Sequence, residues 1–279
     1  MIEIPFNPTM FVLGGLAFTW HGFFAFVGVV VAVFLVGRWA PRAGIDSDVT
    51  FATAVWAIMG GVVGARLVHV IDRWDIYSSN PADILAIWNG GIALFGAIIG
   101  GFGAGALYAK LQGYPIGRLA DLTAPALLIA QSIGRIGDII NGEHVSKATN
   151  AWYGFIYSHP DSLSNQVHGN LGSHPVIVYE MLWNTAVLAL LWYMWGKIKP
   201  DGMLFALYIS LYSFGRFFIT FLREDKIWFA GLQEAHLISI LVMVVAVPLL
   251  VYRGRLVARG EEVGPHVSLR ESQGQKSRK

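Results

Sequence analysis

The sequence predicts an all-α polytopic membrane protein with about seven transmembrane helices and a small loop domain on the outer face. Hydrophobic residues make up 55% of the 279 positions and charged residues only 14%, which is too apolar for an ordinary soluble domain. The apolar residues fall into runs of about 20, the length that spans a bilayer. Lysines and arginines gather in alternate connections between these runs, as expected for loops that share one side of a membrane.

The apolar runs define one transmembrane domain, residues 1–252. We expect spans at roughly 15–37, 51–71, 84–109, 119–140, 175–196, 203–222 and 234–252. Gly96/Gly100 and Gly101/Gly105 have the spacing that lets two helix backbones touch, so we interpret them as packing residues. No internal repeat is evident, which argues against transporters built from inverted repeats.

The basic residues predict the orientation. Those after the first, third, fifth and seventh runs are Arg38, Arg42, Lys110, Arg118, Lys197, Lys199, Arg253, Arg255, Arg259, Arg270, Lys276, Arg278 and Lys279, whereas the opposite side holds only Arg73, Lys147, Arg223 and Lys226. Because cytoplasmic loops are rich in lysine and arginine, we expect the N-terminus outside and the C-terminus in the cytoplasm. Residues 253–279 are expected to form a disordered basic tail, and residues 141–174 the loop region on the outer face.

The fourth run ends in an unusually polar motif, Gln131-Ser-Ile-Gly-Arg-Ile-Gly-Asp-Ile-Ile-Asn-Gly-Glu143. Ionised groups near a bilayer core are costly and persist where they pair, face a wet cavity or hold a polar ligand. Arg135 and Asp138 are three residues apart and share a helix face, so a structural ion pair is one interpretation. The other is a ligand site, since Gly134 and Gly137 leave space beside the arginine.

Two further arginines lie in other runs. Arg216 stands near the outer end of the sixth run, where snorkelling to the headgroups is an alternative interpretation. Arg66 shares a face with His69, which we interpret as a packed structural histidine. Three membrane arginines with few acidic partners favour a bound anion, and phosphate suits guanidinium groups. The chain contains no cysteine, which excludes disulfides, thiolate metal sites and a cysteine nucleophile.

The segment from Asp121 to Glu143 closely resembles the signature of bacterial prolipoprotein diacylglyceryl transferases. Further matches occur in the same order along almost the whole chain: Trp20 and Gly22, Gly64-Ala-Arg66, Trp88-Asn-Gly-Gly-Ile92, His174-Pro with Tyr179-Glu180, and Asp201-Gly through Arg216 to Leu222-Arg-Glu-Asp225. The order and spacing of these motifs make the resemblance specific.

The resemblance implies a seven-span enzyme of the bacterial inner membrane that transfers the diacylglyceryl group of phosphatidylglycerol to the lipobox cysteine thiol of a preprolipoprotein. A thioether forms and glycerol phosphate leaves. Such a reaction needs cations for the phosphate and a group that removes the thiol proton. The resemblance implies no cofactor, no metal and no nucleic-acid partner, and it leaves the oligomeric state open.

The family's functional residues can be carried over to matching positions. Arg135 matches the signature arginine that contacts the phospholipid headgroup, and Arg216 matches a second essential arginine, while Asn141 and Glu143 match the polar cluster. We therefore expect phosphatidylglycerol to be bound by Arg135, Asp138, Asn141 and Arg66, and catalysis to involve Arg216, Glu143, His21 and His144.

The chain departs from the family pattern at five polar positions. Leu94-Phe95-Gly96 lacks a histidine proposed as proton acceptor, His21 replaces a tyrosine, Asp138 an asparagine, Ser146 a glycine and Thr220 a glutamate. Two interpretations stay open. Either His21 or His144 takes over the proton transfer, or the transferase activity is lost and the fold binds an anionic phospholipid or serves as a membrane scaffold. A transporter or channel fits less well, because the polar groups gather near the outer ends rather than along a midplane path.

Overall fold

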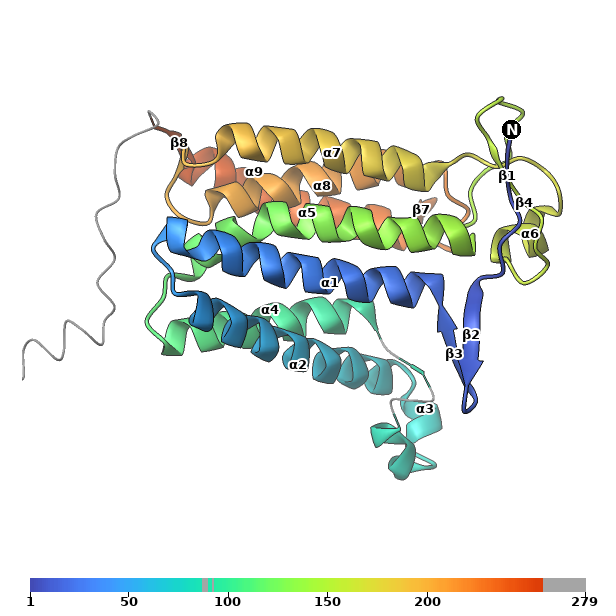
Figure 1. Cartoon of the computed structure of the whole chain (residues 1–279), viewed down its shortest axis with the longest axis horizontal. Coiled ribbons are helices and arrows are strands. Elements are labelled where there is room, and N and C mark those ends of the chain that lie inside the picture. Colours follow the sequence, from blue (N-terminus) through green and yellow to red (C-terminus); the bar gives the residue numbers. More distant parts are fainter. Residues whose placement is uncertain (87–89, 92, 258–279) are drawn as a thin grey trace, which may run out of the picture. The chain divides into compact units, whose positions relative to one another are not determined.

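A computed structural model describes residues 1–86, 90–91 and 93–257, and within them the long helices follow the predicted runs (Figure 1). These are α1 (Trp20–Trp39), α2 (Ser47–Asp72), α4 (Leu94–Leu111), α5 (Ile116–Asn141), α7 (Val176–Met194), α8 (Met203–Thr220) and α9 (Glu234–Arg253). All except α5 have the length and apolarity that a membrane crossing needs. α5 is equally long but carries the polar motif. The prediction of a helical, multi-pass membrane protein is confirmed.

The remaining elements are short. They are β1 (Ile2–Ile4), β2 (Thr9–Leu13), β3 (Leu16–Thr19), η1 (Ala40–Ala43), α3 (Trp74–Tyr77), η2 (Pro81–Leu85), β4 (Phe155–Tyr157), α6 (Leu163–His168), β5 (Ile198–Lys199), β6 (Ile227–Phe229), β7 (Leu232–Gln233) and β8 (Arg255–Leu256). The strands form four two-stranded pairs, of which β1–β4 is parallel, and β2–β3, β5–β8 and β6–β7 are antiparallel.

Two predicted helix starts differ from the structure. The first run was expected to begin near residue 15, but Gly14 and Gly15 both have positive φ and form the turn of the β2–β3 hairpin, so the helix begins at Trp20. The third was expected from residue 84, whereas α4 begins at Leu94. Residues 88, 89 and 92 of the Trp88–Ile92 motif lie outside the described residues, as do residues 258–279 of the predicted tail.

The chain divides into two compact units, one of which comprises residues 36–119. In this unit the backbones of α2 and α4 touch. A Cβ atom added to Gly64 would meet the carbonyl oxygen of Gly96 and lie 3.0 Å from Cα of Gly100, and one added to Gly101 would lie 3.0 Å from the carbonyl oxygen of Ala57. The predicted packing role of these glycines is confirmed, because any side chain would push the helices apart.

The other unit comprises, among the described residues, 1–35 and 120–257. Its apolar core joins α5, α7 and α8 through the buried side chains Ala124, Leu128, Val187, Leu191, Leu204 and Tyr208. α1 lies against α5, because a Cβ atom at Gly28 would be 2.7 Å from the carbonyl oxygen of Ala130. At the start of α8, the Asp121 carboxylate of α5 accepts hydrogen bonds of 2.8 Å from the backbone N–H groups of Gly202 and Phe205.

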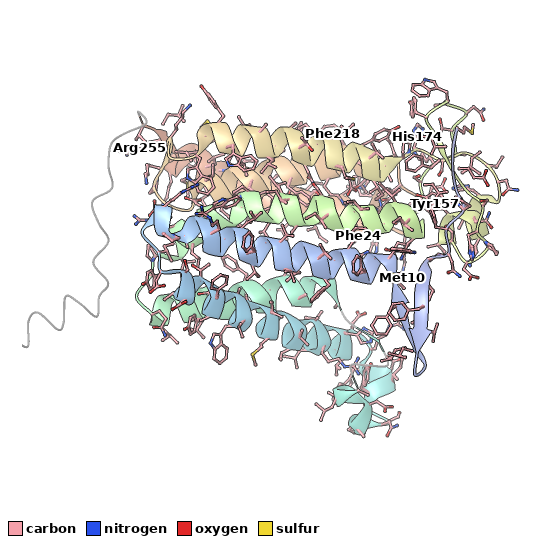
Figure 2. All side chains as sticks on the ribbon, viewed as in Figure 1. Met10, Phe24, Tyr157, His174, Phe218 and Arg255 are labelled. Atoms are coloured by element: carbon pink, nitrogen blue, oxygen red, sulfur yellow. The ribbon has the colours of Figure 1, made fainter. Side chains whose placement is uncertain are left out.

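The loop region 141–174 is tied to the N-terminus. β1 pairs with β4 along the register Ile2–Phe155 to Ile4–Tyr157. α5 ends at Asn141, where Gly142 takes the left-handed conformation with φ of 61°. Within this unit, Tyr157 and His174 lie at the end of the helices opposite to Arg255 (Figure 2). The polar motif therefore ends at the same end of the helices as the loop region.

Candidate active site

Gly137 brings the start of α1 against the last turn of α5. A Cβ atom at Gly137 would lie 2.6 Å from the carbonyl oxygen of Trp20 and 2.7 Å from Cα of His21. This glycine is therefore used for helix contact, whereas Gly134 faces open space. The close approach lets the side chain of His21 reach Asp138 on α5.

Asp138 is the centre of the first half of the site. Its carboxylate is 2% exposed and has partners on both oxygens. Nδ1 of His21 lies 2.5 Å from Oδ1. Nη1 of Arg135 donates to Oδ2 at 2.6 Å, and Nε2 of His144 lies 3.3 Å from the same oxygen. The negative charge that Asp138 adds relative to the family's asparagine is therefore paired on both sides.

Glu180 of α7 is the centre of the second half. Its buried carboxylate accepts from Nη2 of Arg135 at 2.6 Å through Oε2 and from Nη1 of Arg216 through Oε1. The sequence analysis expected few acidic partners for these arginines and gave Glu180 no role. The signal was present, because Glu180 is the one acidic residue within the apolar run 175–196.

Arg223 is a further member that the sequence analysis missed. It lies just after α8 and is only 5% exposed, because the chain around residue 223 runs beside residues 145–147, with Lys147 N donating to Leu222 O at 2.8 Å and Glu224 N to Val145 O at 3.1 Å. Nη2 of Arg223 lies 2.9 Å from Nδ1 of His144.

Arg223 also holds Asp225 through hydrogen bonds of 2.7 and 3.2 Å. Burial disfavours the charged form of the Asp225 carboxyl, but the hydrogen bonds and the charge of Arg223 outweigh burial and lower the pKa of Asp225. Asp225 therefore stays ionised beside the arginine, outside the helical spans.

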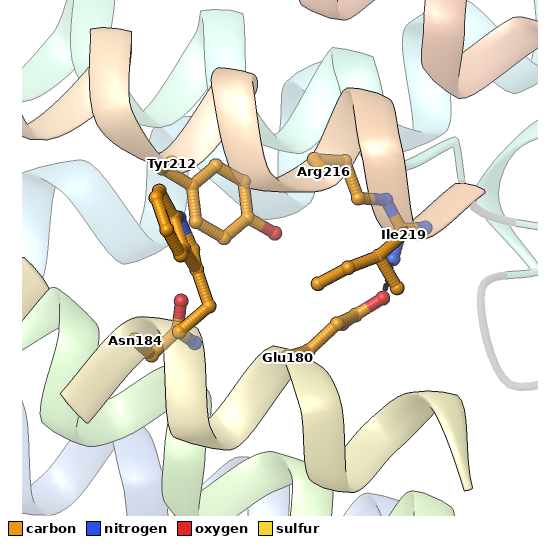
Figure 3. Close-up of a pocket in the computed structure, with 6 residues that line it drawn as sticks. Glu180, Asn184, Tyr212, Arg216 and Ile219 are labelled. Carbon is orange, nitrogen blue, oxygen red and sulfur yellow. Dashed lines mark hydrogen bonds and ion pairs between the residues drawn. The ribbon is translucent and has the colours of Figure 1, made fainter. Parts of the chain in front are cut away.

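A small pocket with a volume of about 10 Å³, the space that one water molecule occupies, opens between α7 and α8 (Figure 3). Glu180, Trp183 and Asn184 line it from α7, and Tyr212, Arg216 and Ile219 line it from α8. Among the described residues, Arg216 donates one hydrogen bond, from Nη1 to Oε1 of Glu180. A guanidinium carries five donors, so Arg216 retains capacity for a ligand in this pocket.

The remaining predicted residues fall into two groups. Asn141 is 4% exposed and its Oδ1 has no hydrogen-bond partner among the described residues. Oε1 of the half-buried Glu143 lies 2.9 Å from Nδ1 of His21. These two residues, together with His21, Arg135, Asp138, His144 and Arg216, gather in the unit that contains α5.

Arg66 belongs to the other unit and has a full set of local partners. Its five donors point at the carbonyl oxygens of Asp83, Ile84, Ala86, Gly90 and Gly91, at distances from 2.5 to 3.4 Å. Its guanidinium also stacks over Tyr77, against which His69 packs edge-on. Arg66 thus holds residues 83–86 and 90–91 against α2, and its part in headgroup binding stays a prediction.

Two departures from the family pattern are satisfied locally. The hydroxyl of Thr220 donates to the carbonyl oxygen of Arg216 at 2.6 Å, and the hydroxyl of Ser146 donates to that of His174 at 2.6 Å. Neither hydroxyl is left for a ligand without breaking a buried hydrogen bond.

The fold and this site define a multi-pass membrane protein with a small pocket lined by Arg216, whose partner Glu180 also binds Arg135. Residues 8–252 match the family model described as prolipoprotein diacylglyceryl transferase, and the chain belongs to this family of transferases.

Similar proteins named phosphatidylglycerol-prolipoprotein diacylglyceryl transferase cover most of the chain. The protein of Bacillus licheniformis is 36% identical over 93% of this chain and 98% of its own length. That of Dehalococcoides mccartyi is 35% identical over 91% and 96%, and that of Listeria welshimeri 33% identical over 89% and 90%. The similarity thus extends across both units rather than over one motif.

Proposed function

We propose that this protein transfers the diacylglyceryl group of phosphatidylglycerol to the cysteine thiol of a prolipoprotein. The thiolate sulfur attacks the glyceryl carbon bound to the phosphate, a thioether forms, and glycerol phosphate leaves with the electrons of the broken C–O bond. The chain needs no cysteine of its own, because the nucleophile belongs to the substrate.

The observation that carries this proposal is the position of Arg216. It lines the pocket between α7 and α8 and is held at one nitrogen by Glu180, so its other donors are oriented and free to bind oxygen. A fixed guanidinium stabilises a phosphate that gains charge as it leaves. Arg135 donates to the other carboxylate oxygen of Glu180, so both arginines would bind the phosphate.

The polar residues around these arginines complete the proposed headgroup site. Asn141 has a buried amide oxygen without a partner among the described residues, which suits a hydroxyl of the headgroup glycerol. Glu143, Asp138 and the two histidines, His21 and His144, are linked by contacts of 2.5 to 3.3 Å and are candidates for handling the thiol proton. We also propose that Arg66 makes a secondary contact with the lipid.

The alternation of basic residues supports a location in the bacterial inner membrane with the N-terminus outside and the C-terminus in the cytoplasm. In that orientation the loop region and the arginines face the side on which a secreted prolipoprotein arrives. Phosphatidylglycerol reaches the pocket from the same membrane.

Purified protein, dioleoyl phosphatidylglycerol vesicles and a peptide with a lipobox cysteine test the proposal. The intact protein should add a diacylglyceryl mass to the peptide, and Arg216→Ala or Arg135→Ala should abolish that product while the protein remains folded in detergent. Arg38→Ala, at an exposed arginine at the end of α1, is the matched control and should keep full activity. Vesicle binding without thioether formation by the intact protein would overturn the transferase and favour a lipid-binding scaffold.

A further inference from the structure

The two candidate histidines differ in whether a ring nitrogen is left to accept a proton from a substrate. Nδ1 of His144 lies 2.9 Å from Nη2 of Arg223. Its Nε2 lies 3.1 Å from Nη1 of Arg135 and 3.3 Å from Oδ2 of Asp138. Both ring nitrogens of His144 therefore have protein partners within hydrogen-bond distance, and neither is left for a substrate proton.

In His21, only one of the two ring nitrogens has a partner among the described residues. Its Nδ1 lies 2.5 Å from Oδ1 of Asp138 and 2.9 Å from Oε1 of Glu143. Both neighbours are carboxylate oxygens, which accept, so Nδ1 carries a proton. In the neutral ring Nε2 is then the acceptor, and no described residue bonds to it. The side chain is 48% exposed, so a substrate thiol can reach this nitrogen.

Asp138 also links this imidazole to the phosphate site. One carboxylate oxygen holds His21, and the other accepts from Arg135 at 2.6 Å. A group that takes the thiol proton must act beside the group that holds the departing phosphate, because both are needed in one transition state. The carboxylate of Asp138 holds His21 and Arg135 close to each other.

His21 and Asp138 lie 117 positions apart in the sequence, and the structure brings them into contact. Together they form a carboxylate–imidazole pair that neither residue makes alone.

We propose that His21 is the proton acceptor of this transferase and that Asp138 is its positioning residue. This inference rests on the proposed function. The proton of the substrate S–H group passes to Nε2 of His21, the thiolate forms the C–S bond, and the C–O bond to the phosphate breaks. Asp138 orients the ring through Nδ1–H and balances the imidazolium that forms, as a carboxylate does in other acid–base pairs.

The test compares His21→Asn with the intact protein in the phosphatidylglycerol and peptide assay. Asparagine keeps a donor near the position of Nδ1, and so the contact with Asp138, but removes Nε2. We expect kcat to fall by about 100- to 10,000-fold with the KM for phosphatidylglycerol nearly unchanged. His159→Gln, in the loop region away from the site, is the matched control and should retain full activity.

Two further measurements separate a catalytic role from a structural one. Added imidazole should restore part of the activity of His21→Ala but none of that of His144→Ala. Asp138→Asn combined with His21→Asn should lose less than the product of the two single losses, because the pair acts as a unit.

The outcomes distinguish the two proposals. If the intact protein and His159→Gln form no thioether, the proposed function fails. If both are active and His21→Asn matches them in kcat, or if imidazole rescues His144→Ala alone, the transferase stands and the assignment of His21 is overturned.

Discussion

Arg135 of α5 and Glu180 of α7 form a buried ion pair of 2.6 Å that joins two helices of the core. The same carboxylate holds Arg216 of α8, so one acidic side chain sets the spacing of two arginines. Without Glu180, Arg216 would lose its carboxylate partner and Arg135 one of its two, and an unpaired charge in such a place is costly.

Glu180→Gln should therefore damage both stability and activity. The amide cannot balance two guanidiniums, and breaking a buried ion pair costs about 3–5 kcal/mol. We expect a lower unfolding temperature in detergent and loss of thioether formation. Glu3→Gln, at an exposed position of β1, should change neither. An unchanged unfolding temperature for Glu180→Gln would show that the arginines do not depend on this carboxylate.

Gly64→Ala should destabilise the unit that contains α2 and α4. The added methyl group would meet the carbonyl oxygen of Gly96, which cannot move away as a side chain can, and overpacking of this kind costs about 1–3 kcal/mol. Gly103→Ala in α4 is the matched control, because nothing lies within 4 Å of its added Cβ atom. Thermal unfolding in detergent should separate the two variants, and equal stability would contradict the close helix contact.

Arg66→Lys should loosen residues 83–86 and 90–91. A lysine has three donors in place of the planar set that reaches five carbonyl oxygens, so the segment loses its clamp. Chymotrypsin should cleave after Leu85 faster than in the intact protein. Arg73→Lys, at an exposed position after α2, should leave the cleavage rate unchanged. A variant that resists cleavage but binds phosphatidylglycerol more weakly would instead support a headgroup role for Arg66.

Asp225 should make stability sensitive to acid. Its pKa is lowered in the folded protein by Arg223, so its contribution is present above the unfolded value of about 3.9 and is lost as the pH falls through the folded pKa. Asp225→Asn removes this contribution, and its stability difference from the intact protein should shrink as the pH falls below about 4. Unfolding temperatures measured between neutral and acid pH would test this, and a difference that stays constant would contradict it.

The helical fold could be predicted because lipid imposes length and apolarity on each span, and both are local properties of the sequence. The bounds that were missed depend on contacts: the turn at Gly14 and Gly15 starts a hairpin, and residues before Leu94 are held by Arg66 from another helix. Neither can be read from hydropathy.

The candidate site could be located but not assembled from the sequence. Arg135, Asp138 and Glu143 lie within one motif, so their neighbourhood was evident. Glu180 and Arg223 come from segments distant in the chain, and their partners depend on which faces of α5, α7 and α8 meet. The structure also joins two departures that looked independent, since His21 and Asp138 are 117 positions apart and in contact.

The parallel pairing of β1 with β4 has a consequence for biosynthesis. Ile2 is made before its partner Phe155, which emerges only after α1, α2, α4 and α5 have been synthesised, a delay on the order of ten seconds. The first strand must stay unpaired during that interval. The contact of His21 with Asp138 is delayed in a similar way, so the reactive centre forms only after α5 has been synthesised.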